Sequence, residues 1–315
     1  MSSERVVLSV VYTSWLVLAT IAQSVLLYFI LRHSPKSFRM FRFLLADTSV
    51  FELLALFATY FTQLGLVTNE QPMLIRSYGF CRFCDAWVCL LVYIFTLVFV
   101  WLSITSIFCT FYFKYLSVVS VLISSTHMLK FIVFCHAPAV LYVALYVWFF
   151  LEISPSPVQL GTLRTLSSEE SSAIGYLPDT ALSFSVIYLM MSVSAVVVPP
   201  VCWFFRKRIV REVNLRAARM SNAKRAQHMT FVKGLSIQII VPSCVYLPAF
   251  VIYYYCYLKE VALPLADLYT FAIAGIPPLV DPIVSLYFVT PFRKSIEQWI
   301  NGGNSSRVIP VSKTI

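Results

Sequence analysis

Length, composition and charge together exclude a water-soluble globular protein. Hydrophobic residues make up 59% of the 315 positions and charged residues only 12%, about half the charged share of a typical soluble domain. The net charge is +10, and the placement of the basic residues along the chain accounts for it without a nucleic-acid partner.

Apolar runs long enough to cross a bilayer, about 18 residues or more, recur along the whole chain. The first run is too long for a signal peptide and lacks a small-residue cleavage site, so we expect it to be retained. The pattern predicts an all-α fold, a seven-transmembrane helix bundle over 1–289 followed by a tail over 290–315. The predicted spans lie near 6–31, 43–66, 86–113, 131–151, 180–205, 234–258 and 265–289.

Basic residues are concentrated in alternate connections between these spans. Of the 24 Lys and Arg residues, 19 fall in 32–42, 114–130, 206–233 and 290–315. Membrane proteins keep such an excess on the cytoplasmic side. We therefore expect the amino terminus outside the cell and the carboxyl terminus in the cytoplasm.

Two acidic residues interrupt the second span. Asp47 and Glu52 are about 140° apart around a helix, so they face different neighbours. A carboxylate at this depth needs a partner, a bound cation or a changed pKa. For Asp47, helix capping or reach toward the membrane interface competes with a role in a conformational switch.

The outer ends of the third and sixth spans carry aromatic side chains. We take five residues as candidate ligand contacts, because aromatic walls with a few polar tips suit a small molecule between helices. An interfacial aromatic belt is the alternative, and it is the better interpretation for Trp87 and Tyr257. The candidate ligand contacts are Asp85, Tyr93, Tyr246, Phe250 and Tyr253.

The connection 206–233 carries nine basic residues and one acid. Its apolar positions have helical spacing, which predicts that the fifth span continues as an amphipathic helix able to dock a protein. Anchoring to anionic lipid explains part of the charge, in particular at residues 206–208. The candidate residues for docking a partner protein, called the candidate coupling residues below, lie beyond residues 206–208. They are Arg216, Arg219, Lys224 and Arg225.

Polar residues beside prolines mark the sixth and seventh spans as a candidate switch. Proline breaks the helical hydrogen-bond ladder, and a carboxylate beside freed carbonyl groups makes a deformable point. A static kink is the competing interpretation. The candidate switch residues are Asp47, Gln238, Pro242, Asp281, Pro282 and Tyr287.

A short amphipathic helix is predicted after the last span. Pro291 begins it, and Phe292, Ile296 and Trp299 share one face, which indicates a helix lying on the inner membrane surface. The four histidines do not cluster in the sequence, and we find no motif for catalysis, for a metal or for another cofactor. We expect that the chain is not an enzyme.

Three stretches of sequence resemble the nematode serpentine chemoreceptors of the Str superfamily, and most closely serpentine receptor class delta. They are the entry to the second span at 37–46, the start of the sixth span at 231–238 with Pro242, and the seventh-span segment 278–293. The resemblance covers nearly the whole chain in order and spacing.

The resemblance implies a chemosensory G-protein-coupled receptor in the plasma membrane, on the cilium of a sensory neuron. It implies a small external ligand of the odorant or pheromone type and a heterotrimeric G protein as partner. Lys114 and Tyr115 stand where such receptors have an Arg-Tyr pair, so they join the candidate coupling residues. Lysine keeps the positive charge but lacks the planar fork of arginine.

The long connection 152–179 contains no cysteine, so the bond that such receptors usually make to this connection cannot form. Cys81 and Cys84 are left to pair with each other, to pair with Cys256, or to stay reduced.

Two other functions stay open. A ligand-gated odorant channel also has seven spans but has its amino terminus inside the cell, which the charge distribution opposes. A transporter usually shows repeated halves, and we find no internal repeat.

Overall fold

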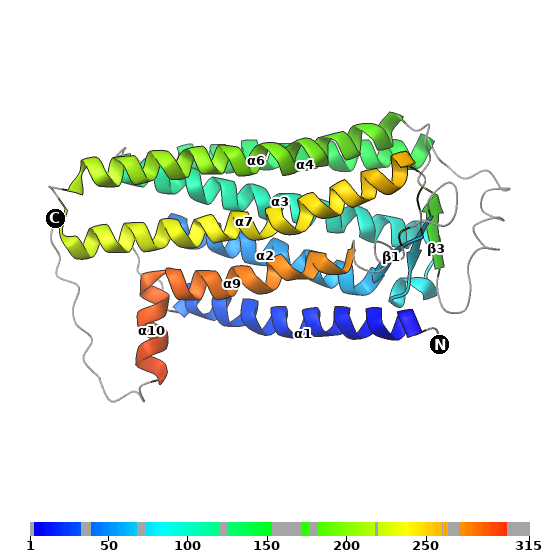
Figure 1. The fold of residues 1–315 in the computed structure, drawn as a ribbon, viewed down its shortest axis with the longest axis horizontal. Coiled ribbons are helices and arrows are strands. Elements are labelled where there is room, and N and C mark those ends of the chain that lie inside the picture. The colour runs from blue at the N-terminus through cyan, green and yellow to red at the C-terminus, as the bar shows by residue number, and fades with distance from the viewer. Residues whose placement is uncertain are drawn as a thin grey trace.

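The computed structural model describes residues 3–32, 39–67, 74–119, 125–152, 172–176, 182–217, 220–259, 261, 263 and 271–300. Long helices lie side by side along the longest axis of the molecule (Figure 1). They are α1 (Ser3–Arg32), α2 (Arg39–Thr62), α3 (Ala86–Val119), α4 (Ser125–Glu152), α6 (Leu182–Leu215), α7 (Asn222–Lys259) and α9 (Ile276–Phe288). The predicted all-α helix bundle is confirmed.

Four of the described helices are long and apolar enough to cross a membrane, and α9 with α10 (Thr290–Ile300) forms a further candidate that bends by 83°. Figure 1 shows α10 turned across one end of the bundle. Many apolar side chains point away from the interior, among them Val10, Phe134 and Val140, which are 60 to 75% exposed. In water these side chains would be unfavourable, whereas lipid solvates them. The chain is a multi-pass membrane protein.

A small sheet covers the other end of the bundle, where the first helix starts (Figure 1). Strands β1 (Leu64–Val67), β2 (Leu74–Ser77) and β3 (Ser172–Tyr176) pair antiparallel in the order β1-β2-β3. We call this end the sheet end and the opposite one the α10 end. The sequence analysis expected no strand here, because each run is too short to show an alternating pattern.

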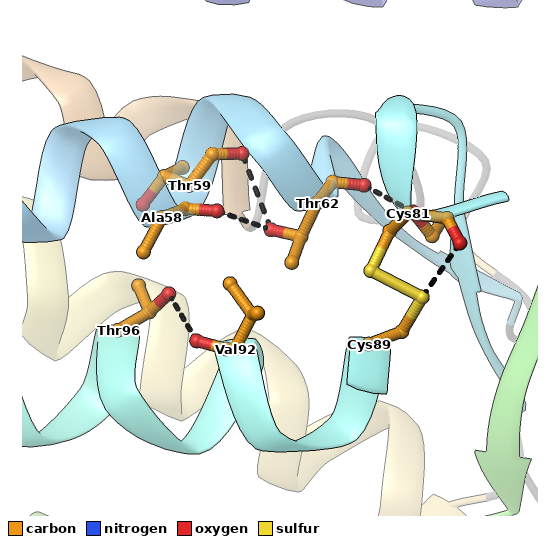
Figure 2. Close-up of a disulfide and its surroundings, with 8 residues drawn as sticks. Ala58, Thr59, Thr62, Cys81, Cys89, Val92 and Thr96 are labelled. Carbon is orange, nitrogen blue, oxygen red and sulfur yellow. Dashed lines mark hydrogen bonds between the residues drawn. A yellow bond between two sulfur atoms is a disulfide. The ribbon is translucent and has the colours of Figure 1, made fainter. Parts of the chain in front are cut away.

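A disulfide bond closes the sheet end. It joins Cys81, in the 3-10 helix η2 (Phe80–Phe83), to Cys89 in the first turns of α3, with 5.4 Å between the Cα atoms (Figure 2). Each pairing considered from the sequence is therefore wrong, because Cys81 bonds to Cys89 and not to Cys84 or Cys256. The chain turns at Asp85, where Val88 N donates to Asp85 O at 2.9 Å, and this turn brings η2 back against α3.

Helix α3 runs through the middle of the packed interior. Toward the sheet end, Tyr93 and Ile94 belong to one buried cluster, which includes Tyr142 of α4. Toward the α10 end, Ile107 and Phe111 belong to a second cluster with side chains of α6 and α7. Residues of α3 therefore pack against α4, α6 and α7.

Helix α6 continues to Leu215, as the amphipathic pattern predicted. Ile209 and Val213 are fully buried in the cluster that α6 forms with α3 and α7. The helix ends soon after Val213, at Leu215, and α7 begins at Asn222. Most residues of the basic connection 206–233 thus belong to the end of α6 or the start of α7 rather than to a loop.

Helices α7 and α9 approach each other closely at Gly234. A Cβ atom at this position would lie 2.5 Å from Cβ of Phe288, which is closer than packed atoms come. Glycine is needed here for the close approach of the two helices.

Candidate functional site

A cavity of about 140 Å³ lies between α3, α6 and α7. Side chains of α2 and α4, Leu64 of β1, and Phe271 and Ala274, which precede α9, complete its wall. Most of the lining is apolar. Its aromatic members are Tyr93, Trp101, Tyr142, Tyr246, Phe250 and Phe271. Cavities of this kind between helices are typical sites for small molecules.

Prolines shape two walls of the cavity. Pro199 of α6 and Pro242 of α7 both line it. Proline has no N–H group, so the carbonyl groups of Ala195 and Gln238, four residues earlier, lose their helical donors. The ladder is therefore interrupted in both helices where they meet the cavity, and a helix bends most easily at such a point.

Three of the five candidate ligand contacts line the cavity: Tyr93, Tyr246 and Phe250. Asp85 does not. It is exposed and lies just before α3 begins. The backbone of Tyr253 belongs to α7, but its side chain lies outside the described residues.

A buried polar cluster stands beside the cavity and connects α1, α2 and α9. Gln23 Nε2 donates to Glu52 Oε2 at 2.5 Å and to the carbonyl oxygen of Pro278 at 3.0 Å. That carbonyl is available because residue 282 is a proline and supplies no N–H. Ser103 of α3 reaches the other Glu52 oxygen at 3.4 Å. A glutamine with no exposed surface therefore holds three helices together.

Asp281 belongs to the same cluster. It is 5% exposed, and its carboxyl group interacts electrostatically with that of Glu52 and by hydrogen bonding with Gln238. Gln238 Nε2 also donates to Ser285 Oγ at 2.8 Å. Two buried carboxyl groups repel each other when both are ionised, so a small change in their separation has a large energetic effect. Gln238 is the residue that both lines the cavity and bonds to α9.

Asp47 occupies a different position. It accepts a hydrogen bond from Ser106 of α3, and His136 Nε2 of α4 lies 3.7 Å from its Oδ2 atom. Its side chain is only 16% exposed and lies well inside α2, so helix capping and reach toward the interface do not describe it. The expectation that Asp47 and Glu52 face different neighbours is confirmed.

The α10 end holds a half-buried cation, Lys114. Nζ of Lys114 lies 4.5 Å from the centre of the Phe231 ring of α7. This cation–π contact joins α3 to α7, so it breaks if the two helices separate. Tyr115 packs against Phe205 of α6, with 5.6 Å between the ring centres.

The other candidate coupling residues lie near the same end. Arg216 donates to the carbonyl oxygen of Val119 at 3.0 Å and so bridges α6 to the end of α3. Arg225 donates to Asn214 at 3.1 Å, and Lys224 is exposed. Arg219 lies outside the described residues.

Tyr287 does not join the candidate switch. Its side chain is 60% exposed and packs edge-on against Phe288. The other five candidate switch residues are placed by the helix packing: Gln238 and Pro242 at the cavity, Asp281 and Pro282 in the polar cluster, and Asp47 with Ser106 and His136.

Several polar residues of the site were missed in the sequence analysis. Gln23 and Ser103 hold Glu52, and Ser106 holds Asp47. Gln23 gave a signal, since an amide inside a strongly apolar span is costly without a partner. The serines gave none, because a serine in a membrane helix commonly bonds to its own backbone.

Comparison with known proteins adds the family context. The family model described as serpentine type 7TM GPCR chemoreceptor Srd matches residues 8–298. Serpentine receptor class delta-40 of Caenorhabditis elegans is 30% identical over 99% of this chain and 98% of its own length. Class delta-44 and delta-45 of the same organism are 27% and 28% identical, each over 94% of this chain and 93% of its own length.

Proposed function

We propose a function from the premise that this chain belongs to the Srd family of serpentine seven-transmembrane chemoreceptors. The protein binds a small external cue in the cavity between α3, α6 and α7 and activates a heterotrimeric G protein at the α10 end. The amino terminus is outside the cell and the tail 290–315 is in the cytoplasm, as the distribution of basic residues favours. The receptor works in the plasma membrane, on the cilium of a sensory neuron.

One observation carries the proposal: Gln238 belongs both to the cavity wall and to the polar cluster at α9. A ligand that moves Gln238 changes the bond to Ser285 and the surroundings of Asp281 at the same time. Pro242 and Pro282 interrupt the helical ladder on either side of this contact, so α7 and α9 are able to bend there. Ligand binding and helix bending thus share one side chain.

The response at the α10 end follows from the contacts between α3, α6 and α7. In this structure, Lys114 contacts Phe231 of α7, and Arg216, which directly follows α6, donates to the end of α3. When α7 moves away from α3, the contact between Lys114 and Phe231 is released and the helix ends become available to a G protein. The ligand favours this state only to the extent that it binds the open state more tightly.

The experiment compares two substitutions in the cavity wall. Gln238→Leu keeps the approximate size and removes the link to α9. Ser243→Ala is the control, since Ser243 also lines the cavity but donates only within α7, to Ile239 O at 2.6 Å. With ligand-driven second-messenger responses measured at equal surface expression, Gln238→Leu is expected to lose most of the response and Ser243→Ala to keep it. Equal responses would refute the proposed link.

A ligand-gated channel or a transporter is the alternative function. The same cells distinguish it, because a channel gives a ligand-driven current that survives removal of G-protein signalling. The proposal requires that the response disappear together with the G protein.

A further inference from the structure

The wall of the cavity carries no formal charge. Among the described residues that line it, there is no aspartate, glutamate, lysine, arginine or histidine. An ionised ligand would lose its hydration on entry and would contact no opposite charge in the wall itself, which is strongly unfavourable; the carboxyl groups of Glu52 and Asp281 belong to the polar cluster beside the cavity and do not line it. Asp85, which precedes the aromatic residues of α3, is exposed and lies outside the wall.

The threonine and serine hydroxyl groups of the wall donate their protons within their own helices. Thr59, Thr96 and Ser243 each donate to the carbonyl oxygen four residues earlier, at 2.7, 2.9 and 2.6 Å. Gln238 donates to Ser285 at 2.8 Å. These side chains therefore offer a ligand acceptor atoms rather than donor groups.

The indole of Trp101 differs from these side chains. Its indole Nε1 is buried and has no hydrogen-bond partner in the described part of the chain. The ring is stacked on Tyr142 at 6.4 Å, with 20° between the planes, so the indole is held in place. Indole N–H is a donor only, and a buried donor without an acceptor is costly. An acceptor atom on the ligand would remove that cost.

The volume sets the size of the ligand. An apolar cavity of about 150 Å³ takes up benzene, and this cavity measures about 140 Å³. The aromatic wall favours a ring, because aromatic pairs pack edge-on or offset. A molecule of about one ring with at most a small substituent matches the volume.

We propose that the cavity selects an uncharged, mainly apolar molecule of about one ring with a small substituent and one hydrogen-bond acceptor, which Trp101 Nε1 recognises. The proposal rests on the proposed function of the cavity as the ligand site and specifies the chemical class of the ligand. Carboxylates and amines of the same shape are rejected.

The test for charge uses four probes of the same shape. Acetophenone and benzamide are neutral, benzoate is an anion and benzamidine is a cation. Dissociation constants are measured by ligand-observed NMR on the full chain in lipid nanodiscs, with empty nanodiscs to correct for partition into lipid. The two neutral probes are expected to bind at least about tenfold more tightly than the two ions.

Each outcome of this test has one meaning. Benzoate or benzamidine binding as tightly as acetophenone overturns the inference, although the cavity remains a ligand site. An absence of saturable binding by all four probes overturns the proposed function of the cavity as well as the inference.

The test for the acceptor compares acetophenone with α-methylstyrene, which replaces the carbonyl oxygen by a CH₂ group. The wild-type chain is expected to prefer acetophenone about fivefold, the effect of one hydrogen bond. Trp101→Phe keeps a ring against Tyr142 and removes the donor, so this preference is expected to vanish. Equal binding of both probes by the wild type, or a preference that survives in Trp101→Phe, overturns the role of Trp101.

Discussion

Replacing Gln23 by leucine tests the polar cluster most sharply. The side chain has no exposed surface and links three helices through its Nε2 atom, with Glu52 at 2.5 Å and the carbonyl oxygen of Pro278 at 3.0 Å. Leucine keeps the approximate volume but has no donor. Gln23→Leu therefore leaves both acceptors buried without this donor.

The expected loss of stability follows from the two bonds. A hydrogen bond to a charged acceptor contributes about 1.5–3 kcal/mol and one to a neutral carbonyl about 0.5–1.5 kcal/mol in soluble proteins. Between membrane helices the measured average is lower, about 0.6 kcal/mol for each bond. The free energy of unfolding is therefore expected to fall by about 2 kcal/mol, within a range of about 1–4 kcal/mol.

The assay is reversible unfolding of the purified chain in detergent, compared with Ser14→Ala as control. Ser14 belongs to the same helix, is exposed and donates only to its own backbone at Val10, 2.7 Å away. The control is expected to change the free energy of unfolding by less than about 0.5 kcal/mol. If Gln23→Leu changes it no more than the control does, Gln23 does not hold the three helices together.

Three further predictions concern orientation, coupling and the switch. Antibody should reach an epitope at residue 2 on intact cells and one at residue 315 only after permeabilisation; the reverse pattern would favour the channel. Asp281→Asn keeps size and removes charge, so at matched surface expression it should shift the ligand dose response several-fold, whereas superimposed curves would make Asp281 part of the scaffold. Replacing four basic residues by alanine should reduce signalling more than surface delivery, and unchanged signalling would assign their charge to lipid anchoring. The four residues are Arg216, Arg219, Lys224 and Arg225.

The sequence predicted most of the bundle because hydropathy alone determines which segments enter a membrane. The sheet end could not be predicted in this way. Strands β1, β2 and β3 have only four or five residues each, and β3 comes from a distant part of the chain. The bond from Cys81 to Cys89 depends on the turn at Asp85, which no spacing of cysteines reveals.

The sequence predicted part of the candidate site, and there is a physical reason why it did not predict the rest. Asp281 and Gln238 stood out because ionisable and amide groups are rare at membrane depth. The hydrogen-bond partners of Glu52 did not stand out, because the rotation of α1 and α3 about their helix axes decides which side chains reach it. The prediction that Asp85 contacts the ligand was wrong. Asp85 precedes the aromatic residues of α3 in the sequence, but it lies before the helix begins, is exposed and does not line the cavity.

The most direct test of the central claim is the affinity of the receptor for one ligand, measured with and without its G protein. If the cavity and the α10 end are coupled, each partner must strengthen binding of the other by the same factor. The account predicts that saturating, nucleotide-free G protein tightens ligand binding to the wild-type chain by at least about fivefold and to Gln238→Leu much less. The same ligand affinity in the presence and absence of G protein would contradict the account.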